Sequence, residues 1–255
     1  MKIIEILNER QRIGKKSIAV LIDPDKVGDA SRLTHLINLG TENCIDFILV
    51  GGSLITTPNL NEVISIIKEN VNHVPVILFP GNAQQVDPSA DAILFLSLIS
   101  GRNADFLIGQ HVQAAPILKN YHMEVLPTGY MLINSGKLSS TAYISNTTPI
   151  PDDKYSIAAA TAIAGEMLGL KLIYLDAGSG AEKEISTRMI STVRKSINVP
   201  LIIGGGINTP QKAQAALDAG ADMIVIGNAL EKDPELLTEI SDCVYNWNQK
   251  LEAGR

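Results

Sequence analysis

The stretch PLIIGGGINTPQKAQAALDAGADMIVIGNAL, residues 200–230, contains the repeating unit of the fold. Apolar runs near its two ends predict short buried strands, and the segment 210–219 between them predicts a helix. Thr209 is the expected N-cap of that helix, Pro210 its first residue, and Gly220 the residue that follows its last turn. The stretch therefore predicts a strand, a helix and a second strand parallel to the first.

The same unit recurs along the whole chain of 255 residues. Short, nearly continuous apolar runs are typical of parallel strands that helices cover on both faces. Strands are expected at residues 17–22, 46–50, 75–79, 91–96, 124–133 (broken by Pro127 and Gly129), 171–175, 200–203 and 222–226. Helices are expected at roughly 29–39, 59–71, 104–120, 153–169, 183–197, 210–219 and 233–249. The alternation, without a low-complexity linker, predicts an α/β protein: a single (β/α)8 TIM barrel domain over residues 1–255.

One interval is too short for the pattern. Only GNAQQVDPSA, residues 81–90, separates the third expected strand from the fourth. A parallel crossover normally takes about a dozen or more residues, usually with a helix. We therefore expect an irregular segment in place of the third crossover helix, which leaves part of the barrel wall uncovered or covered by something else.

Charge and composition exclude several classes of protein. The net charge is −6, with 21 basic and 27 acidic residues, and no basic cluster is visible, which argues against a nucleic-acid partner. Residues 1–16 intersperse charges among apolar side chains, as in an amphipathic helix and not a secretory signal. No uncharged apolar stretch reaches about 18 residues, so no transmembrane segment is expected. Cys44 and Cys243 form no CxxC pair, which favours a reduced, cytoplasmic protein, and the histidine spacing predicts no zinc site.

Glycines follow the last two expected strands. Phosphate often binds there in (β/α)8 barrels, in the loops after strands seven and eight. Here the seventh strand leads into Gly204, Gly205 and Gly206, and the eighth into Gly227 and Asn228. Glycine allows close backbone approach to an anion, and the following helix N-termini supply N–H groups. Either loop alone is equally well read as a simple turn, but the two together favour a phosphate site, which the segment 177–180 would complete.

Acidic side chains lie at two places on the expected mouth of the barrel. Asp176 follows the sixth expected strand beside the glycine loops, where it either caps a turn or accepts a proton from an alcohol. Asp23, Asp25 and Lys26 follow the first strand, and Ser53 follows the second. A carboxylate and a hydroxyl at adjacent positions suit Mg²⁺. The alternative for Asp23 is a helix cap.

Two further loops lie at the same end of the barrel. Arg102 and Asn103 follow the fourth strand, where they could reach diphosphate oxygens or remain solvated. The loop after the fifth strand, 135–151, is too long for a plain turn and is expected to act as a lid or an interface.

The motifs together resemble the geranylgeranylglyceryl phosphate synthase family, which includes the heptaprenylglyceryl phosphate synthases. The resemblance is carried, in order, by LIDPDK (21–26), LVGGS (49–53), SGRNADFLIGQH (100–111), PTGYMLIN (127–134), YLDAGSG (174–180), IIGGGI (202–207) and VIGNAL (225–230). The resemblance implies transfer of a polyprenyl group, geranylgeranyl above all, from its diphosphate to the free hydroxyl of sn-glycerol 1-phosphate. The product would be an ether-lipid precursor, and diphosphate would be released.

The resemblance also implies roles for particular residues. Asp23 and Ser53 match the magnesium ligands of the family, Asp176 retains the acidic residue of its motif and is the candidate proton acceptor, and Lys26 or Arg102 would assist with the diphosphate. The implied glycerol-phosphate site comprises Tyr174, Leu175, Asp176, Ala177, Gly178, Ser179, Gly180, Gly205, Gly206, Gly227 and Asn228.

Two departures from the family pattern bear on these roles. Leu21 stands where many archaeal relatives have lysine, so the diphosphate charge would fall to Mg²⁺ with Lys26 or Arg102. Asp176 is shorter than the glutamate of many relatives, and Ala177 replaces a tyrosine, which leaves the identity of the base open and indicates the second major branch.

Other expectations concern partners and rival functions. We expect a homo-oligomer, either dimer or hexamer, and a peripheral contact with the membrane for the lipid product. A phosphate-binding isomerase or lyase would share the glycine loops but would need no metal at the first two strands. A non-catalytic barrel that binds a phosphorylated ligand is the alternative outside enzymes.

Overall fold

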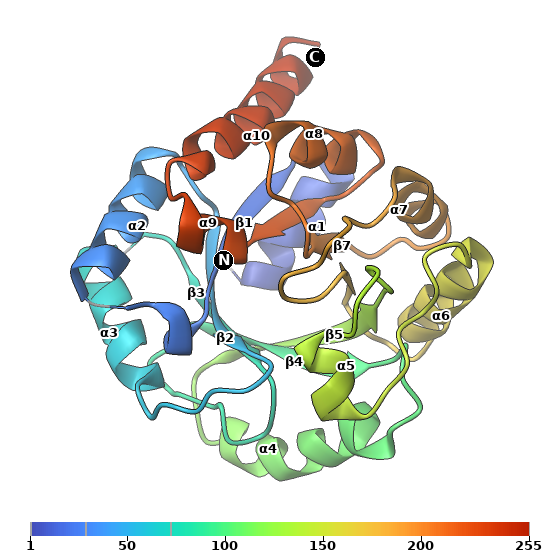
Figure 1. Cartoon of the computed structure of the whole chain (residues 1–255), viewed down its shortest axis with the longest axis horizontal. Coiled ribbons are helices and arrows are strands. Elements are labelled where there is room, and N and C mark those ends of the chain that lie inside the picture. The colour runs from blue at the N-terminus through green and yellow to red at the C-terminus, as the bar shows by residue number, and fades with distance from the viewer. Residues whose placement is uncertain (1, 29, 72, 255) are drawn as a thin grey trace.

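The computed structural model describes residues 2–28, 30–71 and 73–254, and eight parallel strands close into a barrel in chain order (Figure 1). The strands are β1 (Ser17–Ile22), β2 (Phe47–Gly52), β3 (Val76–Pro80), β4 (Ala92–Leu98), β5 (Glu124–Leu132), β6 (Leu172–Asp176), β7 (Leu201–Gly204) and β8 (Met223–Ile226). β8 pairs with β1 in the register Ser17 to Met223, which closes the sheet. The predicted (β/α)8 barrel is confirmed, and each strand lies close to its expected position.

The helices follow the predicted alternation. They are α1 (Ile3–Ile13), α2 (Ala30–Glu42), α3 (Leu60–Asn70), α4 (Gln110–Leu118), α5 (Ser140–Ser145), α6 (Tyr155–Met167), α7 (Thr187–Arg194), α8 (Pro210–Asp218), α9 (Asn228–Lys232) and α10 (Leu236–Ala253). Thr209 caps α8 by accepting from the Lys212 N–H, as the sequence predicts. Position 29, the first residue of the expected helix 29–39, lies outside the described residues. Positions 1, 72 and 255 also lie outside them.

Three local features differ from the expectation. β5 is continuous through Pro127 and Gly129, and the side chains of Ile173 and Ile99 occupy the space beside Gly129, where a Cβ would lie 2.8 Å from each. A π-helical turn, Asp105–Gly109, precedes α4. The short helices α5 and α9 form within loops that follow strands, and both lie over the mouth of the barrel (Figure 1).

Two apolar layers hold the barrel together. Inside it, alternate side chains of the strands pack on one another, among them Phe47, Leu126 and Ile202. Outside it, the opposite side chains of the same strands pack against the ring of helices. α1 closes the bottom of the barrel, since Ile3 and Leu7 join the inner layer and the first N–H groups of the helix donate to the carboxylate of Glu124 at 2.6 and 3.0 Å. With the bottom closed, the ends of the strands at the other side are the accessible face.

The third crossover contains no helix in the structure, which describes every residue of this interval. Residues 81–91 run from β3 to β4 as turns and irregular backbone. Gln110 of α4 accepts from the Ala83 N–H at 2.7 Å, and Gln85 accepts from the Gly81 N–H at 2.7 Å, so the segment is tied down without a helix. The expectation from the length of this interval is confirmed.

Candidate active site at the mouth of the barrel

Glycines of the loops after β6 and β7 meet at the mouth. Gly178, Gly180, Gly205 and Gly206 have positive φ angles of 89°, 68°, 78° and 74°. Gly205 shows why no side chain fits: a Cβ there would lie 2.6 Å from Oδ1 of Asp176 and 2.8 Å from the backbone nitrogen of Ala177. The Ala177 N–H donates to the Gly204 carbonyl at 3.1 Å. We call these four glycines and Asn228 the glycine cluster.

Asn228 brings the loop after β8 into the cluster. Its side-chain amide lies 2.8 Å from Oγ of Ser179, and with its oxygen turned to the loop it also accepts from the Gly180 N–H at 3.1 Å. Gly227 packs against Leu21 of β1, whose Cβ would lie 3.3 Å from a Cβ at Gly227. The structure therefore brings together the three loops that the sequence singled out.

Asp176 is the last residue of β6 and is buried. Its Oδ2 accepts from the Tyr130 hydroxyl at 2.5 Å, and its Oδ1 accepts from the Gly178 N–H at 2.7 Å. Burial raises the pKa of this carboxyl above its ordinary value, while the two hydrogen bonds act in the opposite direction. Asp176 does orient the turn, as one interpretation of the sequence had it. Its raised pKa also makes it a better proton acceptor than an exposed carboxylate.

The side chains that flank Asp176 in the sequence point to different faces of the barrel wall. Tyr174 lies in the inner layer, where its hydroxyl approaches Gly204 so closely that no Cβ would fit there. Burial raises the pKa of Tyr174 well above its ordinary value, so it stays a neutral phenol. Leu175 and Ala177 lie in the outer layer with the helices. Strand alternation turns these two side chains away from the mouth, so Leu175 and Ala177 can reach a ligand there only through their backbone groups.

Two residues at the mouth were missed by sequence reasoning. Nζ of Lys137, in the loop after β5, lies 3.7 Å from where a Cβ of Gly180 would stand. Tyr130 lies within the quoted PTGYMLIN motif but was assigned no role, although it bonds Asp176. A lysine directly after a glycine in a long loop was the available signal for Lys137. No local pattern distinguishes Tyr130 from a core tyrosine.

Asp23 directly follows β1, and its side chain lies beside the end of β2. It caps the short 3₁₀ turn Pro24–Lys26 by accepting from the Asp25 N–H at 3.2 Å, which agrees with the helix-cap interpretation. Its carboxylate also lies beside Gly52, where a Cβ would be 3.3 Å from its Cγ and both oxygens. Nζ of Lys26 lies 3.1 Å from Asp23 and 3.4 Å from Glu231, so one lysine joins the β1 and β8 ends.

Asp25 has a structural role. It accepts from the N–H and hydroxyl of Thr56 at 2.7 and 2.8 Å and from the Thr57 N–H at 3.0 Å. These bonds, the backbone bond of Thr56 first, hold the pKa of Asp25 at about 2. The residue anchors the loop that follows β2, the loop that also contains Ser53.

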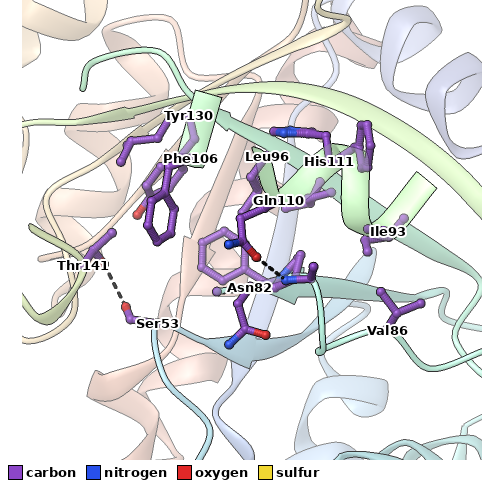
Figure 2. Close-up of a pocket in the computed structure, with 18 of the residues that line it drawn as sticks. Ser53, Asn82, Val86, Ile93, Leu96, Phe106, Gln110, His111, Tyr130 and Thr141 are labelled. Carbon is purple, nitrogen blue, oxygen red and sulfur yellow. Dashed lines mark hydrogen bonds between the residues drawn. The ribbon is translucent and has the colours of Figure 1, made fainter. Parts of the chain in front are cut away.

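Ser53 and Arg102 have different surroundings. Oγ of Ser53 lies 2.8 Å from the hydroxyl of Thr141 in α5 (Figure 2). Arg102 donates to the carbonyls of Gly101 at 2.8 Å and Ile99 at 3.4 Å, so its exposed guanidinium is bound to its own loop. Of the two cations expected near the diphosphate, the structure places Lys26 beside Asp23, whereas Arg102 bonds locally.

An apolar cavity opens where the third crossover helix is missing. It encloses about 780 Å³, part of it open to solvent. It lies between the irregular segment, β3, β4 and α4, and its lining includes Phe79, Val86, Phe95, Leu96, Phe106 and Ala114. Ser53, Tyr130 and Thr141 form part of the same lining (Figure 2). The apolar cavity therefore reaches Tyr130, which bonds Asp176, on one side and Ser53, which follows β2, on the other.

The architecture and these side chains define a class: (β/α)8-barrel proteins in which a glycine-lined polar half and an apolar cavity share one mouth. Residues 11–244 match the model of the PcrB family. A geranylgeranylglyceryl phosphate synthase of Spirosoma linguale is 54% identical over 246 residues, covering 96% of this chain and 98% of that protein. One of Chitinophaga pinensis is 50% identical over 244 residues, covering 96% of each.

A solved structure gives the same result. The (S)-3-O-geranylgeranylglyceryl phosphate synthase of Thermoplasma acidophilum, solved in complex with sn-glycerol-1-phosphate, has a TM-score of 0.90 and 32% identity, covering 96% of this chain and 99% of that one. The chain belongs to the PcrB family. The resemblance and the activity predicted from the motifs are confirmed: the protein is a prenyltransferase of the geranylgeranylglyceryl phosphate synthase type.

Proposed function

We propose that this prenyltransferase joins sn-glycerol 1-phosphate to a polyprenyl diphosphate, with geranylgeranyl diphosphate as the preferred donor. One observation carries the proposal: the glycine cluster and the apolar cavity meet at the same mouth, with Tyr130 between them. The sn-glycerol-1-phosphate bound by the Thermoplasma acidophilum relative supports this acceptor. A polar phosphate and a long apolar chain need these two contrasting surfaces side by side.

The phosphate of the acceptor would lie against the glycine cluster. Left-handed glycines bring backbone groups close to an anion, and α8 and α9 begin just after these loops. Lys137 would add a positive charge at Gly180, and Ser179 and Asn228 would supply side-chain hydrogen bonds. The free hydroxyl of the glycerol would then extend from the cluster toward Asp176.

Asp176 would take the proton of that hydroxyl. As the glycerol oxygen bonds to C1 of the prenyl group, the bond from C1 to the diphosphate oxygen breaks and the diphosphate leaves with its electron pair. The hydroxyl proton passes to Asp176, whose raised pKa favours the transfer. The rings of Tyr130, Tyr174 and Phe79, with centroids 5.5 to 6.0 Å apart, would face the positive charge that develops at C1.

The diphosphate would lie at the β1 and β2 ends. Asp23 and Ser53 offer only oxygen atoms, the ligands that Mg²⁺ prefers, and Gly52 has no side chain to crowd the Asp23 carboxylate on the β2 side. No three His, Cys, Asp or Glu side chains of the described residues cluster as a metal site, so water and diphosphate oxygens would complete the coordination. Bound Mg²⁺ would neutralise charge on the leaving diphosphate. Lys26 would provide a second positive charge beside Asp23.

The proposal extends to the setting of the enzyme. No helix in the described part of the chain is long and apolar enough to cross a bilayer. We place the enzyme in the cytoplasm, with Cys44 and Cys243 as free thiols. Ile108, Val112 and Ile117, on and just before α4, are exposed apolar side chains, which favours a homo-oligomer, dimer or hexamer, that covers them.

The decisive experiment uses radiolabelled sn-glycerol 1-phosphate with prenyl diphosphates of several chain lengths, with and without Mg²⁺. We expect a lipid-soluble product that requires Mg²⁺ and is formed fastest from geranylgeranyl diphosphate. If another prenyl diphosphate gave product faster, its chain length would replace geranylgeranyl as the preferred one. Binding of the acceptor without any product would instead support a phospho-ligand sensor.

A further inference from the structure

Glu231, in the short helix α9, is an acidic residue beside the site proposed for the acceptor phosphate. Its Oε1 lies 3.4 Å from Nζ of Lys26 and 3.3 Å from one end of the Asn228 side-chain amide. Arg32 of α2 donates to the Glu231 carbonyl, and the neighbouring Leu230 is buried, so α9 is anchored at this place. A carboxylate repels a phosphate, so charge alone gives no reason for an acid here.

The partners of the Asn228 amide fix the direction in which it points. An ionised carboxylate only accepts hydrogen bonds, and a backbone N–H only donates. With its nitrogen toward Glu231, the amide of Asn228 donates to Oε1 at 3.3 Å. Its oxygen then accepts from the Gly180 N–H at 3.1 Å and lies 2.8 Å from Oγ of Ser179. Both ends of the amide are therefore satisfied in this orientation.

The opposite orientation of the amide is disfavoured at both ends. It would place the amide oxygen against the Glu231 carboxylate and the amide nitrogen against the Gly180 N–H, so that acceptor faces acceptor and donor faces donor. In return the oxygen would gain only Nζ of Lys26 at 3.5 Å, a long distance for a hydrogen bond. Ser179 favours neither orientation, because a hydroxyl can donate or accept. The Glu231 carboxylate and the Gly180 N–H therefore decide the direction together.

This direction joins two loops of the glycine cluster. Asn228 begins α9, directly after the β8 loop, whereas Gly180 lies in the loop after β6. Gly180 has a positive φ of 68°, and a glycine backbone has more freedom to move than that of any other residue. Holding this glycine before the ligand arrives removes an ordering cost that phosphate binding would otherwise carry.

We propose that Glu231 is a positioning residue of the acceptor site, which turns the Asn228 oxygen toward Gly180 and so sets the spacing of the loops that hold the phosphate. The inference rests on the proposed function, since it requires that sn-glycerol 1-phosphate bind at the glycine cluster. Glu231 thus strengthens the binding of an anion that its own charge repels. Lys26, which contacts the same Oε1, offsets part of that repulsion.

The test compares two replacements of Glu231 by calorimetric titration of the whole protein with sn-glycerol 1-phosphate alone. Glu231→Ala removes the acceptor for the Asn228 amide, and we expect affinity to fall about threefold to tenfold, the effect of one hydrogen bond. Glu231→Gln removes the charge, but its side-chain oxygen still accepts from Asn228, so affinity should equal or exceed that of the wild type. A carboxylate that acted only through its charge would give a gain of affinity in both variants.

Steady-state kinetics and a matched control support the titration. Glu231→Ala should raise KM for sn-glycerol 1-phosphate and leave kcat unchanged, because the contact positions the acceptor site and takes no part in the chemistry. Glu184 is a second carboxylate at the glycine cluster: it pairs with Lys212 at 3.1 Å and lies beside Gly206, in the loop after β7. Glu184→Ala removes this charge without removing the acceptor for Asn228, and it should not lower acceptor affinity.

A double variant tests whether Glu231 acts through Asn228. Asn228→Ala should lower acceptor affinity, and adding Glu231→Ala should lower it no further. The proposal is wrong if Glu231→Ala binds the acceptor at least as tightly as the wild type, if Glu231→Gln loses as much affinity as Glu231→Ala, or if the losses multiply in the double variant. A wild-type protein that does not bind the acceptor would instead overturn the proposed function.

Discussion

The two halves of the mouth are built in opposite ways. The glycine cluster consists of backbone and short side chains held by bonds between three loops, such as Asn228 to Ser179 and the Ala177 N–H to the Gly204 carbonyl. The apolar cavity exists because an element is absent, and irregular residues 81–91 stand where a helix would fill the space. A phosphate has one size and one charge, which suits a fixed set of groups. A prenyl chain is long and featureless, and it needs only apolar volume.

The largest effect on turnover is expected from a variant at the β1 end of the mouth, where the diphosphate would lie. Asp23→Asn removes the charge that would hold Mg²⁺ against the diphosphate, and loss of such stabilisation costs about 10²- to 10³-fold in rate. We expect kcat to fall by that factor while sn-glycerol 1-phosphate affinity, measured by calorimetry, stays nearly intact. Asp153→Asn, at an exposed ion pair with Lys154, serves as the control and should keep full activity. Full turnover and unchanged Mg²⁺ dependence in Asp23→Asn would exclude this carboxylate from the mechanism.

Asp176→Asn should have the next largest effect, because it removes the base on the polar side. Steady-state kinetics should give a kcat lower by at least about 10²-fold, the lower end for loss of a general base. Affinity for the acceptor should change little. Near wild-type turnover would reduce Asp176 to a turn-forming residue, and a matching loss of affinity would make it a binding group.

The same variant carries a prediction about stability. Burial raises the folded-state pKa of Asp176 above 3.8, so its contribution to folding is fully present below that value and is lost as pH rises through the folded-state pKa. As pH rises from 4 to about 8, the melting temperature of Asp176→Asn should therefore increase relative to that of the wild type, because the wild type loses this contribution and asparagine does not titrate. A constant difference across that range would contradict a raised pKa.

Ala83→Phe tests the apolar half of the mouth. Ala83 lies in the irregular segment and lines the cavity, so a larger ring there should displace part of a long prenyl chain. Burial is worth about 0.8 kcal/mol per CH2, and loss of two such groups already costs about tenfold in kcat/KM for geranylgeranyl diphosphate. Acceptor affinity should stay the same. An equal loss for acceptor and donor would mean that the two halves are not independent.

Lys137→Met should have a smaller effect, confined to the glycine cluster. Its ammonium lies near Gly180 on an exposed loop, so solvent weakens its attraction for a phosphate. We expect acceptor affinity to fall about fivefold, with KM rising and kcat unchanged. Lys154→Met, on another exposed loop, is the control. Unchanged acceptor affinity would leave the phosphate to backbone groups alone.

Asp25→Asn should affect stability and hardly affect activity. The pKa of Asp25 is lowered to about 2, so its stabilisation is present above the unfolded value of 3.8 and is lost as pH falls through about 2. Chemical denaturation should show a wild type more stable than the variant at neutral pH, with the difference shrinking in acid. A loss of turnover as large as that of Asp23→Asn would give Asp25 a catalytic role.

Sequence reasoning worked where the signal is local. The length of the segment 81–90 predicted the missing helix, because a chain of ten residues cannot form a parallel crossover with a helix of normal length. Glycines after consecutive strands predicted the cluster, because parallel strands in a barrel end on the same side. The structure adds the direction of the side chains in the motif 174–180: Leu175 faces the helices, because side chains alternate between the two faces of a strand.

The sequence by itself determined the barrel, the order of its loops and the family, since periodicity, glycine positions and motifs are properties of neighbouring residues. Tertiary structure alone decided which distant side chains meet. Tyr130 and Asp176 are 46 residues apart, and Ser53 and Thr141 are 88 apart, yet each pair is in hydrogen-bonding contact. Strand pairing and barrel closure set these contacts, and no local pattern encodes a distance across a closed sheet.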